Sequence, residues 1–400
     1  MALIKLMKQQ NNICRHFGVC GGCDLQNVEY SKQLENKQKF IAELLKDFEI
    51  ETLNNIVPSV DIWYYRNKME FVVGKDKAKN IVAGLREKNK FYKIVDLAEC
   101  KISLKEVGEI LNIVKQWVKE NNIEPYDLIT HQGKIRYVVI RHSKNTNQLM
   151  LNFVITGTKY QFENNEQSLF LELLEGLKKF ENLNSVYVSI NNKVSDNAVA
   201  EELIKIYKED FILEVVNGVK YKIYPSVFFQ PNTKTAELLY DIILDEVCEG
   251  NVMDIYCGSG GISLQLIRNN NIEKIIGVDS SKDNIAIAKA NCELNNISED
   301  KVEFVCDNAE VFLAKLWKSK FISNLSTVIV DPPRPGLSKK VKGILSDIGV
   351  NRIIYVSCNP AVLKEDLKTF IKFYKIKKVI PVDMFPHTKH IEVVCVLEHR

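Results

Sequence analysis

Apolar residues are spaced in different ways along the chain, and each spacing predicts a different kind of structure. Between residues 26 and 48 they recur at helical spacing among charged residues, which indicates one or two helices. From about 57 to 224 they form short runs bounded by turn residues, which are typical of antiparallel strands. Amphipathic helices are expected between these strands at 104–120 and near 166–180.

After about residue 230 the chain alternates between helices and short apolar strands. The strands are expected at 251–255, 274–278, 302–305, 327–330, 352–356, 377–382 and 391–397. Such alternation indicates a doubly wound, Rossmann-like parallel sheet with helices on both faces. The predicted fold class is therefore α/β, with an N-terminal and central α+β region ahead of this sheet.

The length of 400 residues is more than one hydrophobic core usually serves, so several domains are expected. The changes in pattern place an N-terminal segment with helices at 1–56, a central α+β domain at 57–228 and a C-terminal domain at 229–400. Hydrophobic residues make up 46% of the chain and charged residues 26%, which excludes a disordered or fibrous protein. No apolar run is long enough for a membrane span, and residues 1–12 do not resemble a signal peptide, so a cytoplasmic protein is expected.

The net charge of +3 is unevenly distributed along the chain. Residues 61–160 contain 18 Lys and Arg against 11 Asp and Glu, a balance of +7, so the rest of the chain carries about −4. A basic stretch of this kind favours binding to a polyanion such as nucleic acid, although lysine-rich surfaces are also common in proteins that bind none. The central domain is the expected location of such a site.

The segment Asp254–Gly261 (DIYCGSGG) lies where the first predicted strand of the sheet passes into a helix. Its glycines, Gly258 among them, let the backbone turn tightly and approach a ligand. A dinucleotide fingerprint would have a third glycine at Ser263, so a pyrophosphate is not expected. Asp279 ends the next strand, where a carboxylate accepts hydrogen bonds from two ribose hydroxyls. The pattern favours S-adenosylmethionine (SAM), and a glycine-rich turn with structural acids is the alternative.

A second loop, Asp331–Gly336 (DPPRPG), follows the fourth strand and is expected at the same edge of the sheet. Its prolines stiffen the backbone and hold Asp331 for contact with a flat ligand. Enzymes that methylate an exocyclic amino group usually have an aromatic residue after the prolines. Arg334 in that position argues against such a target, while a plain proline turn remains the alternative.

Two further residues have the chemistry of a catalytic pair. Cys358 follows a strand and lies just before Pro360 and a predicted helix, whose positive end would lower the pKa of the thiol. A thiolate there suggests attack on an electrophilic carbon; a buried inert cysteine is the alternative. Glu392 lies in an apolar strand, where burial would raise its pKa toward that of a working base. An edge-strand glutamate facing water is the alternative for Glu392.

Four of the ten cysteines are candidates for a metal site. Disulfides are not expected in a reducing compartment. Cys14, Cys20 and Cys23 form a C-x5-C-x2-C pattern, and Cys100 stands alone after a long gap. Four thiolates suffice for a tetrahedral zinc site or for an iron–sulfur cluster, and the pattern leaves both open.

The motifs, in their order and spacing, resemble those of the SAM-dependent RNA uracil-C5 methyltransferases. They are CRHFGVCGGCDLQ at 14–26, YRNKMEF at 65–71, GKIRYVVIR at 133–141, FFQPN at 228–232, DIYCGSGG at 254–261, GVDSS at 277–281, DPPRPGL at 331–337, YVSCNP at 355–360 and HTKHIEVV at 387–394. The resemblance runs from Cys14 to the C-terminus. It implies a methyltransferase of EC class 2.1.1 that produces 5-methyluridine in RNA.

The resemblance also implies roles for individual residues. The SAM site would be lined by Gln230, Tyr256, Gly258, Asp279, Asp331 and, near the adenine, Asp307 or Asn308. Cys358 would be the nucleophile and Glu392 the general base, while Asp331 is also placed to bind the uracil imide. A [4Fe–4S] cluster would be held by Cys14, Cys20, Cys23 and Cys100.

The expected RNA follows from the same resemblance. Cluster-bearing bacterial members act mostly on large-subunit rRNA, so a uridine of 23S rRNA is expected, with the T-loop of tRNA as the alternative. A third possibility, a non-catalytic RNA-binding assembly factor, would have no need of both Cys358 and Glu392. The chain is expected to act as a monomer.

The chain departs from some relatives ahead of the cysteine motif. Those relatives carry a small β-barrel RNA-binding module there, whereas 13 residues precede Cys14. We therefore expect the central domain to hold the RNA, with phosphate contacts by Arg66, Lys68 and Arg141 and base stacking on an aromatic side chain. The target uridine would be flipped out of its loop to reach Cys358.

Overall fold

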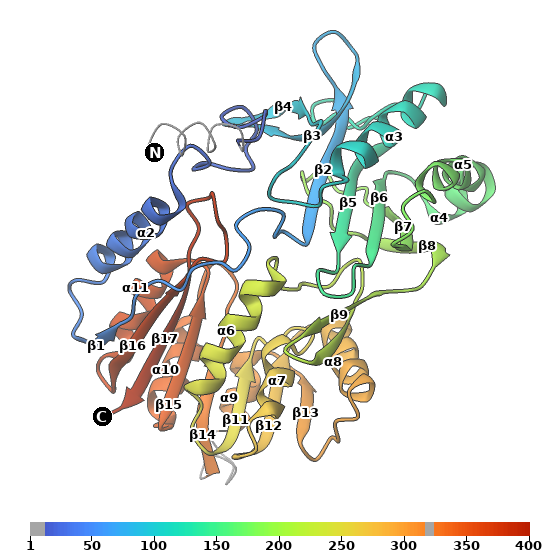
Figure 1. Cartoon of the computed structure of the whole chain (residues 1–400). Helices are drawn as coiled ribbons and strands as arrows, with labels where there is room; N and C mark the ends of the chain where they lie inside the picture. Colours follow the sequence, from blue (N-terminus) through green and yellow to red (C-terminus); the bar gives the residue numbers. More distant parts are fainter. Residues whose placement is uncertain (1–12, 317–323) are drawn as a thin grey trace.

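The computed structural model describes residues 13–316 and 324–400, which fold around two large sheets (Figure 1). An eight-stranded sheet is formed mainly by the C-terminal part of the chain, and a seven-stranded sheet by the central part. The expectation for residues 1–12 lies outside the described residues.

The eight-stranded sheet has the order β1-β16-β17-β15-β14-β11-β12-β13. Its strands are β1 (Ile50–Leu53), β11 (Gly250–Ile255), β12 (Ile272–Asp279), β13 (Val302–Cys306), β14 (Leu325–Val330), β15 (Arg352–Ser357), β16 (Tyr374–Val382) and β17 (Glu392–His399). The neighbours from β13 to β15 are parallel, but β17 is antiparallel to both β15 and β16. The sheet is therefore mixed rather than wholly parallel, because nine residues between β16 and β17 are too few for a parallel crossover.

Helices cover both faces of this sheet, as the alternating pattern predicts. They are α6 (Thr233–Asp245), α7 (Gly261–Gln265), α8 (Lys282–Leu294), α9 (Ala309–Leu316), α10 (Lys339–Ile348) and α11 (Pro360–Phe370). Successive strand residues point to opposite faces, so Ile329 packs in a cluster with α6, α7 and α8, and Val328 packs in another with α9, α10 and α11. The carboxyl ends of β11, β12, β14 and β15 are thereby left free for a ligand site.

The N-terminal segment adds two elements to the eight-stranded sheet. Helix α2 (Tyr30–Leu44) contributes Ile41 to the cluster that also holds α11. Strand β1 extends the sheet edge by pairing parallel to β16, with Ile50 opposite Ile376. The helix agrees with the predicted 26–48 region, whereas β1 was not predicted because its four residues, IETL, show no alternation.

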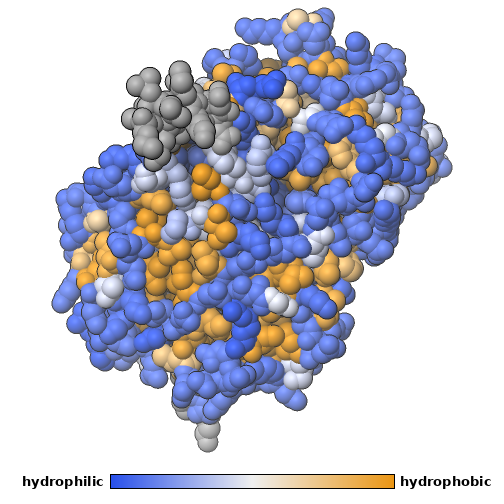
Figure 2. All heavy atoms as spheres, viewed as in Figure 1, coloured by the Kyte–Doolittle hydropathy of each residue, from blue (hydrophilic) through white to orange (hydrophobic). Residues whose placement is uncertain are grey.

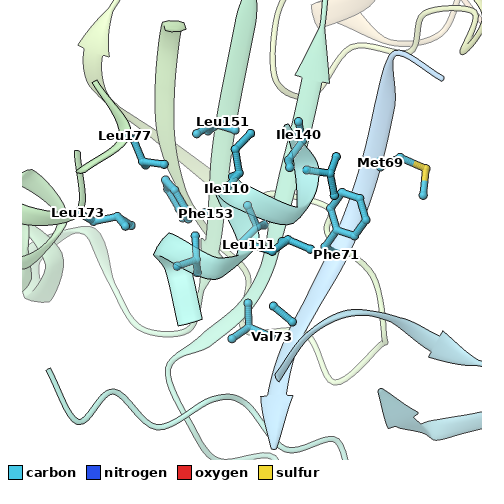
Figure 3. Close-up of a cluster of buried hydrophobic side chains, with 14 of the residues drawn as sticks. Met69, Phe71, Val73, Ile110, Leu111, Ile140, Leu151, Phe153, Leu173 and Leu177 are labelled. Carbon is cyan, nitrogen blue, oxygen red and sulfur yellow. The ribbon is translucent and has the colours of Figure 1, made fainter. Parts of the chain in front are cut away.

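The seven-stranded sheet of the central region has the order β4-β3-β2-β5-β6-β7-β8. Its strands are β2 (Lys68–Lys75), β3 (Ile81–Glu87), β4 (Lys90–Asp96), β5 (Ile135–His142), β6 (Leu149–Ile155), β7 (Leu183–Ile190) and β8 (Glu202–Lys208). Helices α3 (Val107–Glu120) and α5 (Gln167–Leu177) cover one face; a short helix α4 (Lys159–Gln161) and a π-helical turn precede α5. Figure 3 shows this core, in which Ile110 and Leu111 of α3 meet Phe71 and Leu151 of the sheet.

A two-stranded ribbon, β9 (Ile212–Val216) and β10 (Val219–Ile223), connects the two sheet regions. Its apolar residues belong to the same cluster as α6 and α8, and its Glu214 is buried. The Glu214 carboxylate accepts hydrogen bonds from Lys144 N (2.7 Å) and Thr233 Oγ1 (3.0 Å), which ties the central region to α6.

The outer surface in the orientation of Figure 1 is mostly hydrophilic, and its larger apolar areas lie over the eight-stranded sheet (Figure 2). Within the described ranges, no helix has the length and apolar character needed to cross a membrane.

Candidate active site

The glycine loop after β11 makes a tight turn into α7. Tyr256, Gly258 and Gly260 have positive φ angles of 68°, 55° and 85°, a region that glycine enters at low cost. Ser263, which occupies the place of a third glycine, donates its backbone N–H to Asp254 Oδ2 (3.0 Å), and its hydroxyl donates to the same oxygen. The buried carboxyl group of Asp254 therefore fixes the start of α7 to the end of β11 and supports the glycine loop between them.

Asp279 supports the same loop from the neighbouring strand. Its carboxylate accepts hydrogen bonds from Gly258 N (3.1 Å), Ser281 N (2.8 Å) and Asn284 Nδ2 (3.2 Å). The structure thus brings together the glycine loop and the acid that the sequence predicted for the ribose. Asp307, at the end of β13, instead forms an ion pair with Lys315 of α9 (2.7 Å), whose hydrogen bond lowers the pKa of the Asp307 carboxyl.

Three acids form a row at this edge of the sheet, and we call Asp254, Asp331 and Glu392 the acidic row. Burial raises the pKa of Asp254 to about 7. Burial and the charge of Asp254 raise the pKa of Asp331 to about 7. Burial and the charge of Asp331 raise the pKa of Glu392 well above its ordinary value. Each acid is near the next, so the row links the floor of the glycine loop to the first residue of β17.

Strand register explains how Cys358 reaches the acidic row. In the antiparallel pair of β15 and β17, Ser357 lies opposite Val393. Cys358 is the residue that follows β15, and Glu392 is the first residue of β17, so both lie at the same end of this strand pair, close enough for the charge of Glu392 to act on the Cys358 thiol. Asp331 follows β14, which is the other neighbour of β15. Three residues far apart in the sequence thus meet at one edge of the sheet.

The environment of Cys358 differs from the sequence prediction. The thiol is half-buried, and its pKa is raised by burial first and then by the charges of Glu392 and Asp331. Arg334 acts in the opposite direction but is outweighed. The prediction that the start of α11 lowers the pKa of the Cys358 thiol is therefore wrong for the protein without ligand. The position before a helix indicates neither the burial of the thiol nor the two nearby acids.

Gln230 lies in the loop between β10 and α6. Its side chain is buried, its carbonyl accepts a hydrogen bond from Asn67 Nδ2 (2.8 Å), and Phe228 two residues earlier is 68% exposed. The guanidinium of Arg141 donates to Pro225 O (3.1 Å) and to Val227 O, which fastens this loop to β5.

This position of Arg141 contradicts the predicted phosphate contact. The side chain is buried, with 3% exposed, and its charge is used to hold backbone carbonyls. Lys68 pairs with Glu70 (2.6 Å), whereas Arg66 is half-buried without an ion pair among the described residues. The exposure of Phe228 was not predicted, although two adjacent aromatics in FFQPN are a signal that one of them faces outward.

The four cysteines of the N-terminal motif lie in one buried region. Cys14, Cys20, Cys23 and Cys100 are all buried and free of disulfides. Burial raises the pKa of Cys23 to about 12, and the charges of the other three act in the same direction. In residues 13–316 and 324–400, no group of three or more His, Cys, Asp or Glu is arranged to hold a metal ion. The four thiols nevertheless lie near enough to act on one another's pKa.

Comparison with known proteins identifies the family. The family described as tRNA (Uracil-5-)-methyltransferase matches residues 29–400. An RNA methyltransferase of Caldanaerobacter subterraneus is 33% identical over 395 residues, which cover 96% of this chain and 84% of that protein. The tRNA (uracil(54)-C(5))-methyltransferase of Pyrococcus furiosus is 34% identical over 381 residues, which cover 95% of this chain and 84% of that protein.

A solved structure agrees with these relatives. The Pyrococcus abyssi tRNA (uracil-54, C5)-methyltransferase in complex with S-adenosyl-L-homocysteine superposes with a TM-score of 0.77 at 31% identity, covering 95% of this chain and 86% of that one. The chain belongs to the tRNA (uracil-5-)-methyltransferase family. It is a SAM-dependent enzyme that methylates uracil C5 in RNA, and the predicted α/β fold class, family and SAM cofactor are confirmed.

Proposed function

We propose that Cys358 is the nucleophile and Glu392 the general base of the uracil-C5 methylation. The observation that supports this assignment is the register of β15 and β17, which brings Cys358 and Glu392 to the same end of the strand pair. The charge of Glu392 is one of the causes that raise the pKa of the Cys358 thiol, which supports their proximity. A buried acid with a raised pKa is suited to accept a proton near neutral pH.

The reaction proceeds in three steps. The Cys358 thiolate adds to C6, and the electrons of the C5–C6 double bond move into an enolate. Carbon C5 then attacks the methyl group of SAM, and S-adenosylhomocysteine leaves with the electrons of the sulfur–carbon bond. Glu392 removes the proton from C5, the C5–C6 double bond forms again, and the thiolate is expelled.

The SAM site is assigned to residues around the glycine loop. Gln230, Tyr256 and Gly258 lie on loops, and Asp279 is the last residue of β12, at the carboxyl edge of the sheet, which supports their contact with the cofactor. Asp307 reaches the adenine only if its carboxylate leaves Lys315. Asp331 borders both ligands, because it lies between Asp254 under the loop and Glu392 beside the uracil.

The central domain, residues 57–228, is proposed to hold the RNA. Its segment 61–160 carries the balance of +7, and the exposed Phe228 at its end is suited to stack on a base. The relatives that are tRNA (uracil-54, C5)-methyltransferases match nearly the whole chain, which favours a tRNA uridine. A uridine of 23S rRNA, expected from the resemblance to cluster-bearing bacterial enzymes, is the second candidate, and in either case the enzyme acts as a monomer.

The four cysteines are proposed, from the resemblance, to hold a [4Fe–4S] cluster. The proposal is supported by the four thiols, which are free of disulfides, buried and close enough to raise one another's pKa. Methyl transfer needs no electron, so a cluster there would serve as a structural tie. Protein purified without oxygen is expected to be brown and to contain iron and sulfide, and Cys100→Ser should lose both. Bound zinc without iron would refute the assignment.

The substrate is tested directly with methyl-labelled SAM. The protein is incubated with separate pools of unmodified tRNA and rRNA, and the labelled nucleoside is identified after digestion. Label in 5-methyluridine from tRNA supports the first candidate, and the same product from rRNA supports the second. Absence of label in both pools, with SAM binding intact, contradicts the proposed function.

A further inference from the structure

The loop that joins β16 to β17 leads directly into Glu392. It spans residues 383–391. Its two ends lie side by side at Glu392, because Val382 of β16 is paired with Glu392 of β17. Figure 1 shows the loop rising from the end of the eight-stranded sheet toward the N-terminal segment. The backbone of this loop therefore sets the surroundings of the Glu392 carboxyl.

Gln33 of α2 makes a set of buried contacts to this loop and to the turn that precedes α2. Its Nε2 donates to Leu25 O (3.0 Å) and to Val28 O (2.9 Å), and it lies 3.0 Å from His387 Nδ1. Its Oε1 accepts a hydrogen bond from the backbone N–H of His387 (2.9 Å). One fully buried amide group thus fastens the middle of the loop to α2.

His387 is held in a conformation that needs such support. Its φ angle is 63°, in the left-handed region that non-glycine residues seldom adopt without external restraint. The imidazole stacks on Trp63 with a centroid distance of 3.8 Å, and the carbonyl accepts hydrogen bonds from Asp24 N (2.9 Å) and Leu25 N (3.0 Å). The Nδ1 atom of His387 thus lies within hydrogen-bond distance of Gln33, while its buried Nε2 has no hydrogen-bond partner among the described residues.

Lys37, one turn along α2, holds the start of the same loop. Its ammonium pairs with Asp383 Oδ1 (2.6 Å) and donates to Phe385 O (3.1 Å), and both side chains of the pair are buried. A buried polar side chain is costly unless it has hydrogen-bond partners, so helices usually bury apolar residues where they pack. Helix α2 instead buries the polar residues Gln33 and Lys37. The acceptors of Gln33 and Lys37 lie on the 383–391 loop and on the preceding turn.

We propose that Gln33 and His387 are positioning residues for Glu392, and that they latch the 383–391 loop to α2 so that the base keeps its place opposite Cys358. The inference rests on the proposed function of Glu392. The latch acts on the proton-removal step and leaves thiolate addition and methyl transfer in place. A variant that loosens the latch is therefore expected to accumulate the covalent RNA–protein adduct, because removal of the C5 proton, which must precede release of the RNA, becomes slower.

The test uses tRNA and 23S rRNA transcripts that carry tritium at uridine C5. Tritium release measures proton removal, and a denaturing gel measures the covalent RNA–protein adduct. Gln33→Leu is expected to lower tritium release about tenfold or more while the adduct accumulates, because a small displacement of a catalytic group costs one to two orders of magnitude. His387→Leu is expected to behave alike, and His387→Asn, whose side-chain oxygen replaces Nδ1 as acceptor, is expected to restore release.

The matched control is Gln38→Leu on the same helix. Gln38 also uses both ends of its amide, donating to Asn54 O (3.1 Å) and accepting from Ile56 N (2.6 Å), but it holds the segment after β1. It should leave the ratio of adduct to released tritium unchanged. A Gln33→Leu protein in which adduct and release fall in the same proportion, or in which neither changes, overturns the latch. If that variant does not fold, the His387→Leu and His387→Asn pair decides by the same ratio.

Glu392→Gln is measured beside these variants to separate the two claims. If Glu392→Gln releases tritium like the wild type, the proposed base is wrong and the latch falls with it. If Glu392→Gln traps the adduct while both Gln33→Leu and His387→Leu release tritium normally, the base stands and the latch alone is refuted.

Discussion

Glu392→Gln is the sharpest perturbation of the proposed chemistry. The side chain is buried, with 3% exposed, so an amide of the same shape preserves the packing but cannot accept the C5 proton. Loss of a general base typically slows its step by about 10²- to 10⁴-fold. That range corresponds to about 3–5 kcal/mol in the barrier for proton removal.

The same substitution has a second consequence at the thiol. The charge of Glu392 is one of the causes that raise the pKa of Cys358, so a neutral amide lowers that pKa. Asp331 remains as a cause of the raised value, so the shift is partial. Addition of the thiolate is therefore preserved or improved while release is blocked, and the covalent adduct accumulates.

The assay combines a denaturing gel for the adduct with the rate at which iodoacetamide alkylates Cys358. Cys358→Ala supplies the adduct-free reference. Glu398→Gln is the matched control, because this acid of the same strand pairs with Arg352 (3.0 Å) and Lys375 (2.7 Å) away from the site. An adduct level equal to that of the wild type, or unchanged alkylation of Cys358 in Glu392→Gln, would refute this reasoning.

Three further predictions concern stability, the cofactor loop and the cofactor site. Because the pKa of Asp254 rises from 3.8 to about 7, the folded protein holds a proton that the unfolded chain releases between these values. The contribution of Asp254 to stability without ligand should therefore fall as pH increases from about 4 to 7, by about 4 kcal/mol at ~1.4 kcal/mol per pKa unit, and the difference in thermal unfolding between the wild type and Asp254→Asn should change with pH accordingly. Arg141→Met should weaken SAM binding in calorimetry by freeing the loop before Gln230, yet leave the salt dependence of RNA binding unchanged; a reduced salt slope would restore its phosphate role. Asp279→Ala should weaken S-adenosylhomocysteine binding about tenfold or more, since it removes the predicted ribose acceptor and the bond to Gly258 N, and unaltered affinity would contradict the ribose role.

Much of the fold followed from the sequence, because secondary structure depends on local rules, whereas the roles of the catalytic residues were predicted from the resemblance of their motifs to a family. Alternating helices and apolar strands predict a doubly wound sheet wherever they occur, and the turn at Gly258 needs glycine for reasons of backbone sterics. The motifs around Cys358 and Glu392 were sufficient to indicate thiolate chemistry at C6 of uracil. The antiparallel β17 and the edge strand β1 were not foreseen, because strand pairing is a contact between distant segments.

The electrostatics of the site were decided by the tertiary structure alone. Cys358 stands before a helix, which by itself favours a lowered pKa, but the fold half-buries the thiol and places two acids near it, and both effects raise that pKa. Arg141 has the charge of a phosphate ligand and is instead buried under the loop before Gln230. No role was predicted from the sequence for Gln33 and Lys37, which the fold buries against the loop before Glu392. A sequence determines which groups are present, whereas their hydration and their neighbours, which set pKa and role, exist only after the chain has folded.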